Sequence, residues 1–270
     1  MSNRDEVMDI RKRAIERAIH YMHLHIYESL SLFDIADVSA YSPFHFSRVF
    51  KKILGVSPLY YFSTLKFQKA KELLLKTDLT IQDICLDIGH QSLGTFTTAF
   101  TRRVGLSPSS FRSSFMQLEE NLQLIWDIQT DKKDIIKDSD TVISGIISGT
   151  KSFQKGIILI GLFSKVVPEG IPKYLKLMSQ PGKFQFTGIK PGIYYLKAIV
   201  ITENLTPMNI YLPQDLLGAK IEKPIIINKA FPRRERIEMI LKERKNTDRT
   251  VLVSLPLLIQ RYLKEKIRAI

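Results

Sequence analysis

A short helical segment that occurs twice, 50 residues apart, most constrains the fold of this 270-residue chain. The first copy covers residues 42–54 and the second covers residues 92–104. Both copies begin with Ser, and both are followed by Gly and then by Ser-Pro. They place phenylalanine at the same two inner positions, Phe46 and Phe50 in the first and Phe96 and Phe100 in the second. We therefore predict a duplicated unit whose helix has an aromatic inner edge and a polar outer face.

Each copy follows a shorter predicted helix, which gives two helix-turn-helix units. Ser31 and Thr80 are the expected N-caps of these shorter helices, and Asp34 completes a capping box in the first. Small residues let the paired helices approach and the chain turn between them. These are Ala36 and Ala40 in the first unit, and Cys85 and Gly89 in the second.

A continuous helical pattern over residues 59–76 joins the two units. At about 1.5 Å per residue it forms a rod of roughly 27 Å. Successive major grooves on one face of DNA lie about 34 Å apart. The spacing thus predicts that one chain places two recognition helices in adjacent grooves. The alternative is a plain helical bundle, but the repeated helices have outer faces rich in Ser, Thr, Arg and Lys and without the Glu/Lys pairs of solvated helices.

Residues 8–115 resemble the DNA-binding domain of the AraC/XylS family of bacterial transcription regulators. The resemblance covers both helix-turn-helix units, the linking helix with Ala70, Leu73 and Leu74, and the closing Gly105-Leu106-Ser107-Pro108 and Phe111-Arg112. It implies a cytoplasmic transcription factor that binds double-stranded DNA and contacts RNA polymerase. It also implies an effector domain, which senses a small molecule or contacts protein.

The resemblance also implies roles for individual residues. Base-contacting positions fall on Phe44, Ser47 and Arg48 in the first recognition helix, and on Leu93, Gly94, Thr95 and Thr98 in the second. Arg48 can bond guanine with two hydrogen bonds, and Phe44 can pack on a thymine methyl group. The second set lacks long polar side chains, so we expect DNA shape to matter more there. Expected phosphate contacts are Ser42, Lys51, Lys52, Ser92, Arg102 and Arg103. The lysines have a simpler alternative role in solvating a helix end.

Other chemistry receives little support from the sequence. Some DNA-repair methyltransferases join a similar domain to a reactive cysteine, but Cys85 lies on an apolar helix face with Ile81, Ile84 and Ile88. A buried cysteine is normally inert. His20, His23 and His25 have helical spacing without a cysteine or acidic partner, so we expect packed or exposed histidines and no metal. We therefore expect that the chain is not an enzyme and that it binds no cofactor.

Charge and composition place the chain among cytoplasmic proteins with a polyanionic partner. The net charge is +13, carried mostly by the second half: residues 1–120 hold 15 Lys and Arg against 13 Asp and Glu, and residues 121–270 hold 25 against 14. One cysteine allows no internal disulfide. No apolar run is long enough for a membrane span, and the charged start predicts no signal peptide.

The second half changes to the pattern of β-strands. We predict a linker over 117–138, with a docked segment at 124–128 around Trp126, and a β-rich domain over 139–270. Strands are expected at 142–147, 156–163, 174–178, 183–186, 193–201 and 224–228. Phe184, Phe186, Tyr194, Leu196 and Ala198 should face inward, and an amphipathic helix should cover 255–270. Residues 182–198 resemble the prealbumin-like sandwich of carboxypeptidase regulatory-like modules. The alternative is a GyrI-like effector domain, which needs two long helices.

The predicted architecture is multidomain: an all-α double helix-turn-helix domain of about seven helices over 1–116, then a mostly-β, sandwich-like domain with a terminal helix. The predicted function is sequence-specific transcription regulation, as monomer or homodimer. The alternative is a β-domain binding module with weak or architectural DNA contact. Basic residues at 233–236 and 242–249 are either a solvated surface or further contacts to phosphates or polymerase.

Overall fold

The computed structural model describes residues 3–116, 141–149, 156–213, 216–221, 223–228, 234–243, 248 and 251–267. The predicted linker at 117–138, with Trp126, lies outside these residues. The helical part consists of α1 (Asn3–Leu24), α2 (Leu32–Asp37), α3 (Pro43–Leu54), α4 (Pro58–Lys76), α5 (Ile81–Asp87), α6 (Leu93–Val104) and α7 (Pro108–Met116). The seven predicted helices are thus confirmed. In the described part of the chain, no helix is long and apolar enough to cross a membrane.

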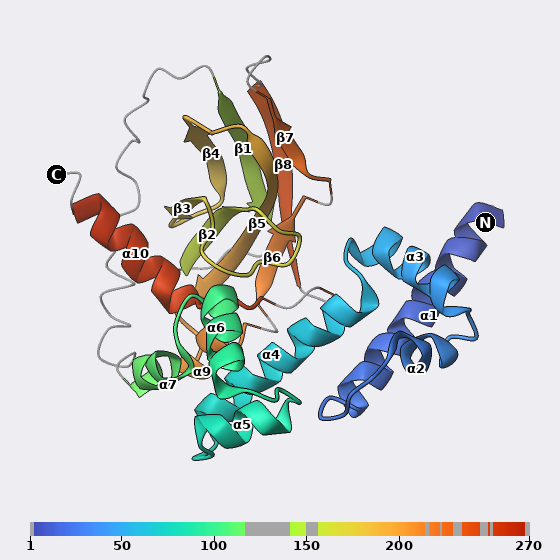
Figure 1. Cartoon of the computed structure of the whole chain (residues 1–270). Helices are drawn as coiled ribbons and strands as arrows, with labels where there is room; N and C mark the ends of the chain where they lie inside the picture. The colour runs from blue at the N-terminus through green and yellow to red at the C-terminus, as the bar shows by residue number, and fades with distance from the viewer. Residues whose placement is uncertain are drawn as a thin grey trace.

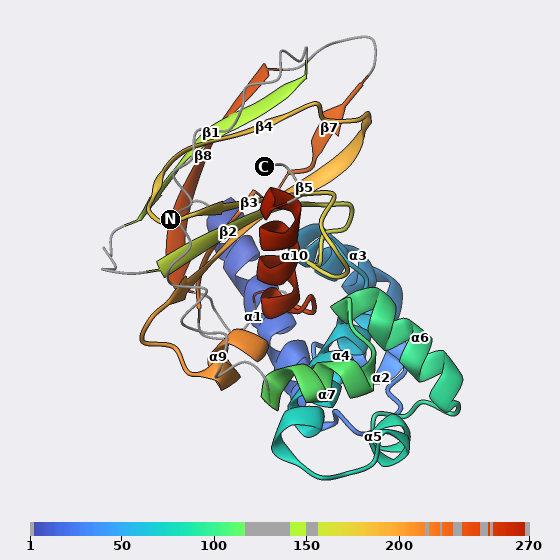
Figure 2. The same cartoon turned by 90° about the vertical axis from the view of Figure 1, so that its left-hand side faces the viewer.

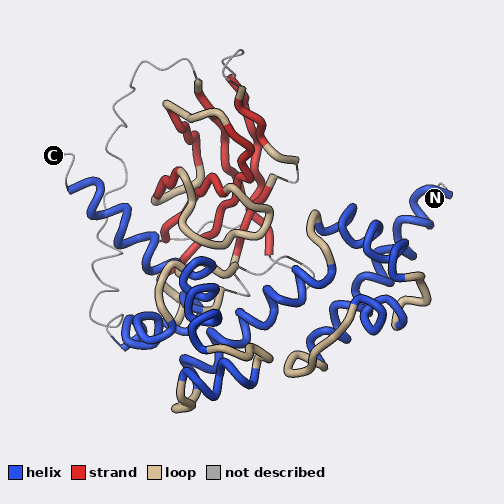
Figure 3. The backbone as a smooth tube through the Cα atoms, in the orientation of Figure 1, coloured by secondary structure: helices blue, strands red, loops and turns tan. Residues whose placement is uncertain are grey.

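Two helix-turn-helix units lie at opposite ends of α4 (Figures 1 and 3). The first, α1 to α3, buries a core drawn from residues 15–65, including Ile35, Phe46 and Phe50. The turn between α2 and α3 places Ala40 at φ 54°, and the equivalent turn in the second unit places Gly89 at φ 76°. The predicted capping box forms between Ser31 and Asp34, and the predicted N-cap Thr80 forms a second one with Asp83. The repeated sequence therefore builds a repeated local structure.

The second half is a mostly-β domain with a terminal helix, as predicted. Its strands are β1 (Val142–Gly149), β2 (Gly156–Phe163), β3 (Tyr174–Met178), β4 (Gly182–Thr187), β5 (Gly192–Thr202), β6 (Leu217–Lys220), β7 (Ile225–Ile227) and β8 (Arg234–Glu243). Its helices are α9 (Pro207–Tyr211) and α10 (Leu255–Ile267). In 139–230, the described residues form only the five-residue α9 as helix, not the two long helices of a GyrI-like domain.

The strands form one hydrogen-bonded path, in the order β3-β2-β5-β6-β8-β1-β4, with β7 beside β5. The pairs are antiparallel except β1 with β8, which run parallel from Val142 opposite Arg234 to Gly149 opposite Leu241. The sheet curls around an apolar interior that includes all five residues predicted to face inward: Phe184, Phe186, Tyr194, Leu196 and Ala198.

Strand β8 was not predicted, because its charges suggested a basic surface. Buried Ile237, Met239 and Leu241 alternate with exposed residues, which are charged except for Ile240, and this gives the period of a half-buried strand. Arg236 and Lys242 stay exposed on its outer face. Arg233 and residues 244–247 and 249 of the basic stretches lie outside the described residues.

Strands β2 and β5 are buried on both faces, because two different cores use them. On one face Ile158, Ile160, Leu196 and Val200 fill the interior of the curled sheet. On the other face Ile157, Leu159, Ile199 and Ile201 join a core with the second helix-turn-helix unit. Their near-continuous apolar sequences follow from this double burial.

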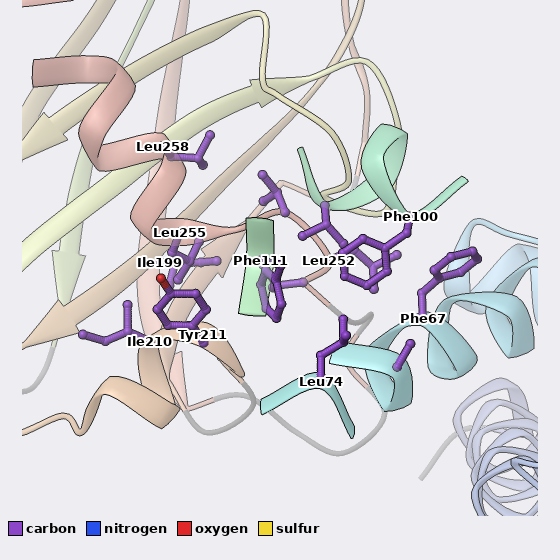
Figure 4. Close-up of a cluster of buried hydrophobic side chains, with 14 of the residues drawn as sticks. Phe67, Leu74, Phe100, Phe111, Ile199, Ile210, Tyr211, Leu252, Leu255 and Leu258 are labelled. Carbon is purple, nitrogen blue, oxygen red and sulfur yellow. The ribbon is translucent and has the colours of Figure 1, made fainter. Parts of the chain in front are cut away.

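That second core crosses from the helical part to the β domain. It combines Phe67, Phe100 and Phe111 of α4, α6 and α7 with residues of β2, β3, β5, α9 and α10. In Figure 4, Phe111 and Tyr211 face each other between Leu74 on one side and Leu255 on the other. Their rings are 5.3 Å apart and nearly perpendicular. The second unit is therefore packed into the β domain.

Candidate nucleic-acid interface

The first candidate reading element is α3, and its ends are set by local sequence. Ser42 is the N-cap, and its hydroxyl accepts a hydrogen bond from the backbone N–H of His45 at 3.4 Å. Pro43 stands in the first turn, where its missing N–H costs little. Gly55 ends the helix with φ 73°, a left-handed conformation that favours glycine.

The outer face of α3 carries the three residues predicted to contact bases. Phe44, Ser47 and Arg48 are spaced three and four residues apart, so they share one face. Phe44 is 77% exposed, Arg48 is exposed and Ser47 is half-buried. A phenyl ring so exposed has no role in the core, whereas the inner Phe46 and Phe50 are fully buried.

The second candidate reading element, α6, repeats this construction with a different outer face. Ser92 caps it by accepting from the N–H of Thr95, and Gly105 ends it at φ 94°. Leu93 is 42% exposed, and Gly94, Thr95 and Thr98 are also exposed. The Thr95 hydroxyl donates to the Ser92 carbonyl at 2.8 Å, so this oxygen is left to act as an acceptor.

The two elements are held apart by α4, which has 19 residues. At about 1.5 Å per residue, it is roughly 28 Å long. Figure 2 shows α3 and α6 on the same side of the molecule, at the right of the view. The length of α4 approaches the distance of about 34 Å between successive major grooves on one face of DNA.

Most predicted phosphate contacts lie at helix ends and are exposed. Ser42 and Ser92 stand at the N-termini of α3 and α6, Lys51 and Lys52 in the last turn of α3, and Arg102 in the last turn of α6; all five are exposed. Cationic side chains in a last turn also interact favourably with the helix dipole.

Arg103 differs from these residues, because it is only 8% exposed. One of its terminal nitrogens lies 3.4 Å from a carboxylate oxygen of Glu169, which is also 8% exposed. The guanidinium packs over the rings of Tyr60 and Phe67, 5.2 and 4.7 Å from their centroids. In this arrangement Arg103 faces the protein interior and not the outer face of α6, so its guanidinium is not placed to contact a phosphate.

Sequence reasoning missed Glu169, because it follows β2 in a segment with no motif of its own. Burial of Tyr60, together with the negative charge of Glu169, raises the pKa of the Tyr60 hydroxyl. Glu169 also pairs with Lys165. The only advance signal was Arg103 itself, which aligns with apolar Ile53 in the first copy.

The remaining candidate chemical groups are placed as follows. Cys85 is buried, its Sγ lies 3.6 Å from the His90 carbonyl, and burial raises the pKa of its thiol. The deprotonated, reactive form is therefore disfavoured. His25 bonds Glu28, and burial lowers the pKa of His23. Among the described residues, no three metal-ligating side chains gather.

Comparison with known proteins assigns the class of the helical part. Residues 35–114 match the family model of a helix-turn-helix domain. The chain is 33% identical over 97 residues to the HTH-type transcriptional regulator YobQ of Bacillus subtilis, covering 36% of this chain and 40% of that protein. It is 32% identical over 98 residues to the bifunctional transcriptional activator/DNA repair enzyme AdaA of the same organism, covering 36% and 46%. The chain spans less than half the length of these relatives.

A solved AraC-type transcriptional regulator from Chromobacterium violaceum is 29% identical, covers 38% of this chain and 91% of its own, and superposes with a TM-score of 0.37. The fold and the matched residues define a double helix-turn-helix domain. Residues 35–114 form an AraC-type DNA-binding domain, and the resemblance to the family is confirmed for this part of the chain.

Proposed function

We propose that this chain is a sequence-specific transcription regulator that places α3 and α6 in successive major grooves of double-stranded DNA. The observation that carries the proposal is the pair of capped helices with exposed outer faces, held apart by the 19-residue α4. One subunit then reads two grooves without a partner, so the DNA site needs no palindrome.

The two helices contribute differently in this proposal. Arg48 bonds guanine and Phe44 packs on a thymine methyl, with Ser47 beside them. Leu93, Gly94, Thr95 and Thr98 offer short side chains, so α6 fits the shape of its groove more than it reads base edges. Ser42, Lys51, Lys52, Ser92 and Arg102 contact phosphates and fix the register of the protein on the duplex.

The β domain is proposed to sense a small molecule or to contact protein, RNA polymerase included. Its resemblance to carboxypeptidase regulatory-like sandwiches stays a prediction, as do the boundaries 1–116, 117–138 and 139–270. Exposed Arg236 and Lys242 on β8 are candidates for additional phosphate contacts. The buried Cys85 supports a regulator without enzymatic activity, and a regulator of this kind acts in the cytoplasm.

A second function is a binding module whose β domain acts alone, with weak DNA contact. The short side chains on α6 favour it. The two functions are distinguished by selecting bound sequences from a random DNA pool with the full chain. Enrichment of two sequence elements about one helical turn apart supports the regulator, and no enrichment supports the binding module.

The reading role of α3 is tested on the selected DNA with R48A. We expect relaxed preference at one base pair, by about 1–3 kcal/mol, with the other positions unchanged. R17A is the matched control, because Arg17 is an exposed arginine on α1. An R48A protein that selects the same sequence as the wild type contradicts this assignment.

A further inference from the structure

The last turn of α6 is held by backbone groups of the β domain. The N–H of Gly170 donates to the carbonyl of Arg103, and the N–H of Ser254 donates to the carbonyl of Val104 at 2.9 Å. The final carbonyls of a helix have no partner within the helix. Here two segments of the β domain supply these partners: the connection from β2 to β3, and the residues that lead into α10.

These two segments also hold each other. The N–H groups of Leu252 and Val253 both donate to the carbonyl of Pro168, next to Glu169. The fit against α6 is close: a Cβ built on Gly105 would lie 2.7 Å from Leu257 of α10, and one built on Gly170 would lie 3.0 Å from the carbonyl of Arg102. The end of α6 therefore has little room to shift against the β domain.

A buried ion pair completes this contact. The Arg103 guanidinium of α6 lies over Tyr60 and Phe67 of α4, and its charge faces Glu169 of the β domain at 3.4 Å. Three parts of the molecule thus meet at one charged group. A buried charge that loses its partner is strongly unfavourable, so Arg103 would leave this position for solvent without Glu169.

The first unit differs at the position that matches Arg103. Ile53, which aligns with Arg103, packs against the core of the first unit, and the fully and partly buried members of that core come from residues 15–65. The core of the second unit includes β2, β5 and α10. Among the described residues, only the second recognition helix ends in an ion pair with the β domain.

We propose that Glu169 is a positioning residue for DNA recognition: through Arg103 it fixes the orientation of α6 on α4, and so places the second reading helix for its groove. This inference rests on the proposed function. It identifies the β domain as a structural determinant of where α6 lies. A ligand or protein that shifts the connection between β2 and β3 would change binding at the second groove and leave the first unchanged.

The test compares two DNA probes with the full chain. One carries both sequence elements selected from the random pool, and the other has the element of the second groove scrambled. The dissociation constant for the scrambled probe, divided by that for the intact probe, measures how much α6 contributes to binding. For E169Q we expect this ratio to fall by about ten-fold toward one, comparable to losing one or two base contacts, with affinity for the scrambled probe unchanged.

Two further variants show whether the effect of E169Q is specific to the ion pair between Glu169 and Arg103. D248N is the matched control, because Asp248 also pairs with a lysine of the β domain, Lys220 at 2.9 Å on β6; it should keep the wild-type ratio. E169D keeps the negative charge but moves it away from Arg103 by one methylene group, so we expect a ratio between those of the wild type and E169Q. Circular dichroism checks that each variant is folded.

The outcomes separate the inference from the function on which it rests. An E169Q protein that keeps the wild-type ratio overturns the positioning role and leaves the proposed function standing. Equal weakening on both probes, with loss of folded signal, also overturns it, because Glu169 then only stabilises the fold. A wild-type ratio of one refutes two-groove reading itself.

Discussion

Replacing Phe111 by alanine tests whether the second helix-turn-helix unit and the β domain unfold together. The Phe111 ring is fully buried in the core that joins them. It lies 5.7 Å from the ring of Phe100 and 5.3 Å from that of Tyr211, and the Nζ of Lys71 is 5.7 Å from its centroid. The substitution therefore removes contacts to α4, α6 and α9 at once.

The expected cost is about 3–5 kcal/mol, the usual range for removing a buried phenylalanine. The two aromatic contacts account for about 0.5–1.5 kcal/mol each within that total. Such a loss is a large fraction of the roughly 5–15 kcal/mol that stabilises an ordinary protein. Denaturant unfolding of the full chain gives the total, and hydrogen exchange read by segment shows where the stability is lost.

In F111A we expect exchange to rise together in α5 to α7 and in β2, β5 and α10, with α1 to α3 unchanged. F46A is the matched control, because Phe46 is equally buried in the core of the first unit; it should affect α1 to α3 and spare β2 and β5. If F111A raises exchange in α5 to α7 alone, the shared core does not couple the two parts and the reasoning fails.

Three further predictions follow from particular positions. G105A should cost about 1–3 kcal/mol of stability in thermal unfolding, because its φ is 94° and the added Cβ would meet Leu257. G94A should be neutral or stabilising, because its φ is not positive and the added Cβ would only make an ordinary contact with the Ser92 hydroxyl at 3.8 Å. Burial and nearby cations lower the pKa of His90, so folding favours its neutral ring. The free energy of unfolding should therefore fall as the pH drops below the ordinary value of 6.5. In H90Q this dependence of stability on pH should be weaker. The pair of changes R236Q and K242Q should reduce the salt slope of DNA binding by about one per lost phosphate contact, and an unchanged slope removes β8 from the interface.

Much of the helical part could be predicted, because its information is local. The N-caps, the capping boxes and the phenylalanines at helical spacing each act within a few residues, and the 50-residue offset shows that the unit occurs twice. Six strands were likewise predicted from β-branched runs bounded by Gly and Pro. β8 was missed because its charged residues dominate the sequence while Ile237, Met239 and Leu241 alternate beneath them.

The joint between the two halves could not be predicted, since its partners are far apart in sequence. Arg103 has the positive charge and the helix-end position expected of a phosphate contact. Its partner Glu169 is brought to it only in the folded chain. The doubly buried strands β2 and β5 carried a signal, because their near-continuous apolar residues exceed what one core requires. That pattern indicates a second packing partner, but it does not identify α6 and α7.

Hydroxyl-radical footprinting of the full chain on its selected DNA tests the central claim most directly. Two recognition helices joined by α4 should protect two stretches on one face of the duplex, about 10 base pairs apart. One protected stretch would show that a single helix reads DNA, and uniform or absent protection would contradict sequence-specific binding by this chain.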